Sequence, residues 1–304
     1  MSTPGAVKSL DPAVLDRLSS LSLVARAVVE GFMAGQHRST HLGSSVEFAQ
    51  HREYALGDEL RRVDWRVFGR SDRLVVKQFV EEENLVCHLM LDASESMGYG
   101  SLGWTKLDYA RWSAAALAHL VLSSRDTAGL VVFDEGYRTK VPPGNGAMQR
   151  KVILDTLEAA EPSGKTSVGS VLRWVAPKLK RRGIVCIFSD FFDDPDGILA
   201  GVRLLRSGGH EPILFQVLDP EEVSFGFESL LKLEGLEGTG IHKIDPRAIR
   251  EAYLEEIGKH NTELARAARS ISVDFVPIET STPLEAALST YLAHRMARAR
   301  GGRR

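Results

Sequence analysis

The sequence predicts an α/β fold built on a doubly wound, mostly parallel sheet of the Rossmann type. Unbroken apolar runs recur at residues 85–91, 128–133 and 184–189, and such runs are typical of parallel strands that helices cover on both faces. Stretches with helical spacing of apolar residues separate these runs, which indicates βαβ units. Polar residues follow two of the strands, where ligands bind in open α/β sheets. We therefore expect a binding site at the carboxyl edge of the sheet.

Composition and charge set limits on the class of protein. The chain has 304 residues, 43% of them hydrophobic and 26% charged, and its formal net charge is −2. This is the composition of an ordinary soluble globular protein, and the charge gives no general case for binding nucleic acid or an anionic membrane. No apolar run approaches the ~18–20 residues of a membrane span, and the N-terminus lacks a signal-peptide pattern. We expect a cytoplasmic protein without a membrane span.

The N-terminal part of the chain divides into a leader, a helix and a charged segment. Residues 1–10 are expected to be loose, and residues 11–33 show helical spacing with Asp11 as the cap. Residues 37–84 are rich in charged and aromatic side chains, with a strand expected at 74–80. Two interpretations of this segment stay open: a structural network of ion pairs stacked on aromatic rings, or a surface that docks a partner. The residues that carry either role are Arg52, Tyr54, Asp58, Arg61, Asp64, Trp65 and Arg70.

The remaining elements follow from apolar spacing and from turn residues. Helices are expected at 105–123, 147–160, 168–181, 196–207, 246–269 and 283–298. Strands are expected at 85–91, 128–133, 137–141, 184–189, 212–218 and 272–278. Residues 219–245 lack clear periodicity and are expected to form a loop or a short hairpin. Cys87 and Cys186 lie in apolar strands and are expected to be reduced thiols of the core.

A short polar motif follows the first buried strand. Asp92, Ser94 and Ser96 come at alternate positions where that strand ends. A carboxylate and two hydroxyls are oxygen ligands of the kind that Mg²⁺ prefers. The alternative is that Asp92 and Ser94 only cap the next segment, since both residue types favour that position.

Two further polar residues are expected at the same edge of the sheet. Thr166 precedes the helix at 168, and Asp190 ends the strand at 184–189. A doubly wound sheet brings these loops to the edge that carries Asp92. Two carboxylates ~5 Å apart repel by about 3 kcal/mol at an effective dielectric of ~20, and a divalent ion relieves that repulsion.

An ordered set of residues ahead of this motif resembles the signature of the DUF58 family. The set, followed by Asp-x-Ser-x-Ser, comprises Glu47-Phe48, Arg52, Tyr54, Gly57-Asp58, Arg61, Asp64-Trp65, Arg70, Leu74 and Lys77. That family is similar to von Willebrand factor A domains. The resemblance implies a von Willebrand factor A-like domain at 82–298, preceded by an N-terminal helix and signature segment at 1–81 and followed by a basic tail at 299–304.

The resemblance also implies a function. In von Willebrand factor A domains the metal-ion-dependent adhesion site, or MIDAS, is formed by an Asp-x-Ser-x-Ser loop, a Thr and a further Asp. By resemblance, the ligands of Mg²⁺ or Mn²⁺ here are Asp92, Ser94, Ser96, Thr166 and Asp190. The expected function is non-enzymatic, metal-dependent protein binding, in which the metal bridges to an Asp or Glu of the partner. DUF58-like proteins are often encoded beside MoxR-type AAA+ ATPases, which implies an adaptor role in chaperone-like assembly.

Two other classes of function compete with this one. A metal-dependent hydrolase could use Asp92 and Asp190, although no histidine is spaced to activate Ser94, and His88 and His119 are the nearest in sequence. A structural scaffold with an empty site is the second alternative. The stretch 164–167 ends like a phosphate-binding loop, but position 159 is Ala where that loop begins with Gly.

Overall fold

The computed structural model describes residues 11–18, 20–36, 48–55, 58, 63–79, 85–226, 231–234, 241–244, 246–284, 288–291 and 293. The chain forms two compact units, one of residues 1–36 with 85–304 and one of residues 37–84. The expected division placed the N-terminal helix together with the signature segment in residues 1–81. In the structure this helix belongs to the larger unit.

The larger unit is built on a six-stranded sheet with the order β10-β7-β6-β3-β4-β5. Five strands are parallel and β5 is an antiparallel edge strand, which confirms the predicted mostly parallel, doubly wound sheet. The strands are β3 (Val86–Asp92), β4 (Thr127–Phe133), β5 (Tyr137–Gly144), β6 (Ile184–Ser189), β7 (Glu211–Leu218) and β10 (Asp274–Glu279). Strand β5 continues past its expected end through Pro142 and Pro143, which an edge strand tolerates because it pairs on one side only.

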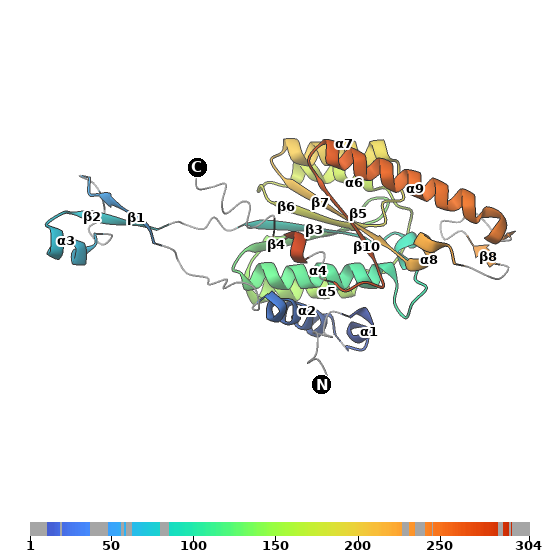
Figure 1. Cartoon of the computed structure of the whole chain (residues 1–304), viewed down its shortest axis with the longest axis horizontal. Coiled ribbons are helices and arrows are strands. Elements are labelled where there is room, and N and C mark those ends of the chain that lie inside the picture. Colours follow the sequence, from blue (N-terminus) through green and yellow to red (C-terminus); the bar gives the residue numbers. More distant parts are fainter. Residues whose placement is uncertain are drawn as a thin grey trace, which may run out of the picture. The chain divides into compact units, whose positions relative to one another are not determined.

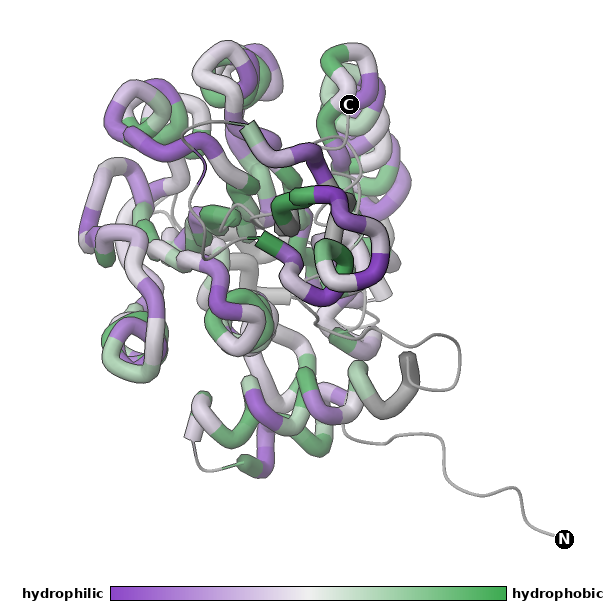
Figure 2. The backbone as a smooth tube through the Cα atoms, turned by 90° about the vertical axis from the view of Figure 1, so that its left-hand side faces the viewer, coloured by the Kyte–Doolittle hydropathy of each residue, from purple (hydrophilic) through white to green (hydrophobic). Residues whose placement is uncertain are grey.

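Helices cover both faces of this sheet (Figure 1). One face is covered by α4 (Lys106–Ser123) and α5 (Gly146–Glu158), with α2 (Leu21–Gln36) packed on the outer side of α4, and the other face by α6 (Val168–Val175), α7 (Pro195–Ser207) and α9 (Pro246–Ser270). Side chains of β3 alternate between the two cores because successive residues of a strand point to opposite faces: Leu89 and Leu91 pack under α4, and Met90 packs under α6. The helices in Figure 2 accordingly carry both hydrophobic and hydrophilic colour.

Several elements differ in extent from the sequence prediction. The first helix is two helices, α1 (Pro12–Leu15), capped by the Asp11 side chain, and α2. Helix α6 ends at Val175 and continues as the 3₁₀ turn Ala176–Lys178, since Pro177 has no N–H to extend the α-helical ladder. Most of the helix expected at 283–298 lies outside the described residues. Within that range, residues 288–291 and 293 are described and are helical.

The segment 219–245 contains a short helix, α8 (Pro220–Ser224), and two strands. These strands, β8 (Leu231–Glu234) and β9 (Ile241–Ile244), pair antiparallel. Among the described residues, no helix combines the length and the hydropathy that crossing a membrane requires.

The smaller unit contains two antiparallel strands, β1 (Phe48–Glu53) and β2 (Val75–Phe79), and the helix α3 (Trp65–Ser71). Strand β2 matches the predicted strand at 74–80, whereas β1 and α3 were not predicted. Asp64 caps α3 by accepting from the backbone N–H groups of Arg66 and Val67 at 3.0 and 3.4 Å.

Helices α6 and α7 approach each other closely at a glycine. A Cβ added to Gly169 would lie 2.5 Å from the backbone carbon of Gly197, so a side chain there forces the two helices apart. We expect Gly169→Ala to lower the free energy of unfolding by about 1–3 kcal/mol, measured by urea denaturation.

Gly258→Ala is the matched control, because Gly258 lies in α9 and an added Cβ meets nothing within 4 Å. There alanine is expected to be neutral or to stabilise by up to about 1 kcal/mol, from its higher helix propensity. Equal stability of the two variants would contradict close contact between α6 and α7.

Candidate metal and partner-binding site

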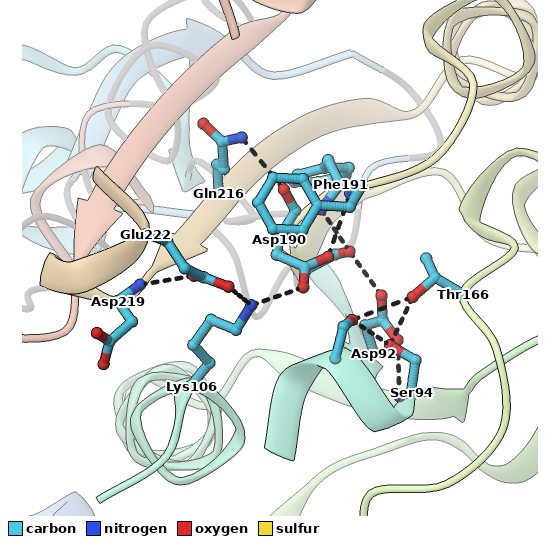
Figure 3. A network of polar contacts seen from close by, with 12 residues as sticks. Asp92, Ser94, Lys106, Thr166, Asp190, Phe191, Gln216, Asp219 and Glu222 are labelled. Carbon is cyan, nitrogen blue, oxygen red and sulfur yellow. Dashed lines mark hydrogen bonds and ion pairs between the residues drawn. The ribbon is translucent and has the colours of Figure 1, made fainter. Parts of the chain in front are cut away.

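The five predicted ligands come together at the carboxyl edge of the sheet, where the strand order reverses between β3 and β6. Figure 3 labels four of them, Asp92, Ser94, Thr166 and Asp190. Asp92 is the last residue of β3, and Asp190 directly follows β6. The crossover connections leave these neighbouring strands in opposite directions, which opens a crevice at their ends. Asp92, Ser94 and Asp190 have no exposed surface, whereas Ser96 and Thr166 are partly exposed.

The loop after β3 has a defined backbone conformation. The Asp92 carboxylate accepts from the Ser94 N–H at 3.0 Å, and Ala93 N donates to Phe133 O at 2.7 Å. Ser94 stands at the cap position of the 3₁₀ turn Glu95–Gly98 but makes no side-chain capping bond. The alternative that Ser94 is only a cap is therefore not supported by its contacts.

The loop that carries Thr166 is fixed against the first loop by backbone hydrogen bonds. Glu95 N donates to Gly164 O and Ser163 N donates to Ala93 O, both at 2.9 Å. Arg138 reaches across from β5 and donates to Glu161 O at 2.7 Å. These contacts bring the Thr166 side chain to the two serines.

Three hydroxyl oxygens form a compact triangle at the mouth of the site. Thr166 Oγ1 lies 2.6 Å from Ser94 Oγ and 3.3 Å from Ser96 Oγ, and the two serine oxygens are 3.1 Å apart. Mg²⁺ binds oxygen at about 2.0–2.1 Å in octahedral geometry, so ligands on one face of the octahedron are about 2.9 Å apart. The hydroxyl triangle therefore fits the ligand spacing of Mg²⁺ or of the similar ion Mn²⁺.

Among the described residues there is no cluster of three or more His, Cys, Asp or Glu side chains that could hold a metal. A cation at this edge would thus depend on hydroxyl oxygens together with Asp92 and Asp190. That donor set consists of oxygen alone, which favours a hard cation over zinc or copper.

Asp92 lies in an environment that disfavours its charge. Burial, and next the charge of Asp190, raise the pKa of Asp92 to about 7, against hydrogen bonds from Ser189 Oγ at 2.6 Å and from Ser94 N. Without a cation the group is partly protonated at neutral pH. A cation that contacts the site would favour the charged form.

The structure adds Lys106, which the sequence analysis did not identify. Its Nζ donates to Asp190 Oδ2 at 2.8 Å and to Glu222 Oε1 at 2.6 Å, and its side chain is fully buried. One signal could have revealed it: Lys106 is the first residue of α4, and the helix macrodipole disfavours a cation there unless acidic groups compensate.

The histidines considered as catalytic bases make other contacts. His88 Nε2 lies 3.0 Å from Arg181 O, and the His88 ring packs edge-on against His210. Burial lowers the pKa of His88 to about 4. His119 lies near the end of α4 and is about half-buried.

The predicted network of the signature segment forms in part within the smaller unit. Arg52 Nη2 donates to both carboxylate oxygens of Asp58, at 2.7 and 2.8 Å. Asp64 is used as the cap of α3, and the Trp65 side chain is 57% exposed rather than buried among these charges. Tyr54 is half-buried, Arg70 is exposed, and Arg61 lies outside the described residues.

Cys87 and Cys186 are free, buried thiols on the adjacent strands β3 and β6, with sulfur atoms 4.0 Å apart. They match the expectation of reduced thiols in the core.

The fold and this arrangement define a von Willebrand factor A-like domain: a doubly wound sheet with an Asp-x-Ser-x-Ser loop after its central strand, joined by Thr166 and Asp190. Residues 50–263 match the family described as "Protein of unknown function DUF58", and the chain belongs to this family.

Similar proteins include relatives and solved structures. "Uncharacterized protein Rv1480" of Mycobacterium tuberculosis (strain ATCC 25618 / H37Rv) is 27% identical over 293 residues, which cover 94% of this chain and 90% of the relative. The conserved hypothetical protein BatB from Bacteroides thetaiotaomicron aligns with a TM-score of 0.47 and 18% identity, over 70% of this chain and 99% of that one. The SpRpn10 VWA domain aligns with a TM-score of 0.42 and 10% identity, over 68% and 95%.

The raised pKa of Asp92 predicts a pH-dependent stability in the absence of metal. The carboxyl pKa is about 7 in the folded protein against an ordinary value of 3.8. Between these values the folded state binds a proton that the unfolded state does not, so the free energy of unfolding falls as pH rises and levels off above pH 7.

The variant Asp92→Asn tests this, because asparagine carries no charge at pH 5 or at pH 8. In EDTA, we expect Asp92→Asn to be more stable than wild type by more than about 1 kcal/mol at pH 8, with a smaller difference at pH 5.

Urea unfolding at both pH values measures this effect. Asp196→Asn is the control, because Asp196 is an exposed carboxylate in the first turn of α7. The same stability difference at pH 5 and pH 8 for Asp92→Asn would contradict the raised pKa.

Proposed function

We propose that this DUF58 protein is a non-enzymatic, Mg²⁺-dependent protein-interaction module, with Mn²⁺ as a substitute ion. The observation that carries the proposal is the hydroxyl triangle of Ser94, Ser96 and Thr166, whose oxygen separations of 2.6–3.3 Å suit one face of an octahedral ion. When bound, the ion supplies open coordination positions that a carboxylate of a partner protein can fill.

The chain's own residues have separate tasks in this site. Ser189 Oγ and Ser94 N hold the Asp92 carboxylate in one orientation. Asp190 follows β6 and adds a second buried negative charge. Because Ser96 and Thr166 are the partly exposed members of the set, an incoming carboxylate would approach the site from their side.

Membership of the DUF58 family supports a MoxR-type AAA+ ATPase as partner. The partner, or a client that the two proteins share, would offer an Asp or Glu to the metal. The proposed role is that of a cytoplasmic adaptor in chaperone-like, ATP-driven assembly or maturation.

Within the part of the chain that the structure describes, no contact supports the hydrolase alternative. The Ser94 hydroxyl accepts from Thr166 and lies beside Ser96, while His88 contacts a main-chain carbonyl oxygen and a second ring. Turnover of generic phosphoesters with Mg²⁺ or Mn²⁺, lost in Asp92→Asn, would favour the hydrolase instead.

Metal binding predicts a ligand-dependent gain in thermal stability. A ligand that binds only the folded state stabilises it, by about 2.7 kcal/mol at a concentration of 100 times Kd. We expect saturating Mg²⁺ to raise the Tm of the wild type and to raise that of Ser96→Ala much less, because one oxygen of the triangle is missing. Ser123→Ala, at an exposed position in the last turn of α4, should respond like the wild type. A shift of equal size in Ser96→Ala would place the stabilising ion elsewhere.

Partner capture tests the bridge itself. We expect affinity capture from native lysate to recover a MoxR-type AAA+ ATPase with the wild type in Mg²⁺ but not in EDTA. Asp92→Asn should fail in both conditions, and Asp196→Asn should behave like the wild type. Equal recovery under all conditions would refute metal bridging and would direct attention to the signature segment around Arg52 and Trp65.

A further inference from the structure

A buried lysine contacts the candidate metal site. Lys106 is the first residue of α4, directly after the N-cap Thr105, which forms a capping box with Asp108. Its side chain is fully buried and its ammonium donates to Asp190 at 2.8 Å and to Glu222 at 2.6 Å. Figure 3 shows the ammonium between these two carboxylates, with Asp190 on the side of Asp92, Ser94 and Thr166.

The surroundings of Lys106 keep it charged. A lysine ammonium is ordinarily charged at neutral pH, and the carboxylates of Asp190 and Glu222 contact it at 2.8 and 2.6 Å, which favours the charged form. The Phe192 ring lies 5.1 Å from the ammonium and covers it. The site therefore contains a permanent positive charge that belongs to the protein.

Asp190 is held from several sides. Its Oδ2 atom accepts from Lys106, its Oδ1 atom accepts from Phe192 N at 3.2 Å, and its main-chain oxygen accepts from Gln216 Nε2 at 3.1 Å. Among the described residues, the Asp92 carboxylate accepts from neutral donors, Ser94 N and Ser189 Oγ, and makes no ion pair. The two acids of the site therefore have different electrostatic roles.

Glu222 connects this ion pair to α8. Its Oε2 atom accepts from Asp219 N at 2.9 Å in the capping box of α8. Asp219 in turn accepts from the N–H and hydroxyl of Ser101, at 2.8 and 2.6 Å. The Lys106 ammonium therefore links Asp190, at the end of β6, to Glu222 in α8.

The formal charges show what Lys106 does for a bound cation. With all three acids ionised, Asp92, Asp190 and Glu222 contribute three negative charges, and Lys106 offsets one of them. The remainder is two negative charges, which a divalent ion neutralises. Without the ammonium, the same pocket would attract cations more strongly, since like charges repel across short, poorly solvated distances.

We propose that Lys106 is a positioning residue and a built-in counter-ion of the metal site: it holds Asp190 in place and keeps the intrinsic cation affinity low. A loosely held ion depends more on an additional ligand, so metal and partner carboxylate would bind cooperatively. This inference rests on the proposed function, since it concerns the same ion.

Mn²⁺ binding to the full-length protein, measured by isothermal titration calorimetry at pH 8, tests the inference. We expect Lys106→Met to lower the Kd for Mn²⁺ at least tenfold and Lys106→Arg to stay within threefold of the wild type. Glu222→Gln removes a negative charge but keeps the lysine, so its Kd should rise at least threefold.

The double variant Lys106→Met/Glu222→Gln keeps the test valid if Lys106→Met alone does not fold, because it removes both partners of an ion pair. Its formal charge equals that of the wild type. Since Lys106 contacts Asp190 directly and Glu222 contacts Lys106, we expect the double variant to bind Mn²⁺ at least fivefold more tightly than the wild type.

The outcomes separate this inference from the proposed function. If Asp92→Asn weakens Mn²⁺ binding but the Lys106 variants match the wild type or bind more weakly, Lys106 is only a structural ion-pair partner and this inference is wrong, while the metal site stands. If no variant binds Mn²⁺, the proposed function and the inference are both wrong.

Discussion

The organising constraint of the larger unit is the burial of two carboxylates at the ends of adjacent parallel strands. Asp92 and Asp190 have no exposed surface, and a buried ionised carboxylate requires compensation by charge or hydrogen bonds. The protein compensates Asp190 with Lys106 and Asp92 with neutral donors. The uneven compensation leaves the Asp92 side of the crevice, where the hydroxyls meet, as the place that a cation would stabilise most.

This constraint accounts for the loops around the site. The loop with Thr166 is tied to the Asp92 loop through Gly164 O and Ala93 O, and the loop after β6 is tied to α9 because His260 Nε2 lies 2.9 Å from Phe191 O. The loops that carry the candidate ligands must be held rigidly. If the ligand oxygens were displaced by about an ångström, their separations would no longer match the ligand spacing of a small ion. The tie between the Thr166 loop and the Asp92 loop is made by main-chain hydrogen bonds, which most sequence changes leave in place, whereas the tie to α9 depends on the His260 side chain.

The sequence predicted the central strands well because their signal is local and strong. Strands β3, β4 and β6 are runs of apolar residues that only a sheet covered on both faces can bury. The five candidate ligands followed from the order of these strands and from the family resemblance. By contrast, the short α3 and β1 carry polar residues with little periodicity, so no local pattern indicated them.

Lys106 and Glu222 were missed for a different reason. Their partners are far away in sequence: Asp190 lies 84 positions after Lys106, and Glu222 lies 116 positions after it. A lysine in the first turn of a helix is ordinarily assigned to the surface. Only the folded chain shows that the crossover after β7 brings Glu222 back to the start of α4.

The assignment of α2 to the larger unit has a consequence for how the protein can be divided. Val24, Val28 and Phe32 of α2 are buried in the core that includes α4, although the signature segment separates α2 from β3 in the chain. The segment 37–84 is therefore an insertion with both ends attached to one unit. A chain shortened to begin at residue 82 would lack α2 and would expose an apolar face of α4 to water. Such a chain would be prone to aggregate because α2 is missing, whatever the role of the signature segment. Removing residues 37–84 and joining the flanking ends with a flexible linker would instead keep that face covered.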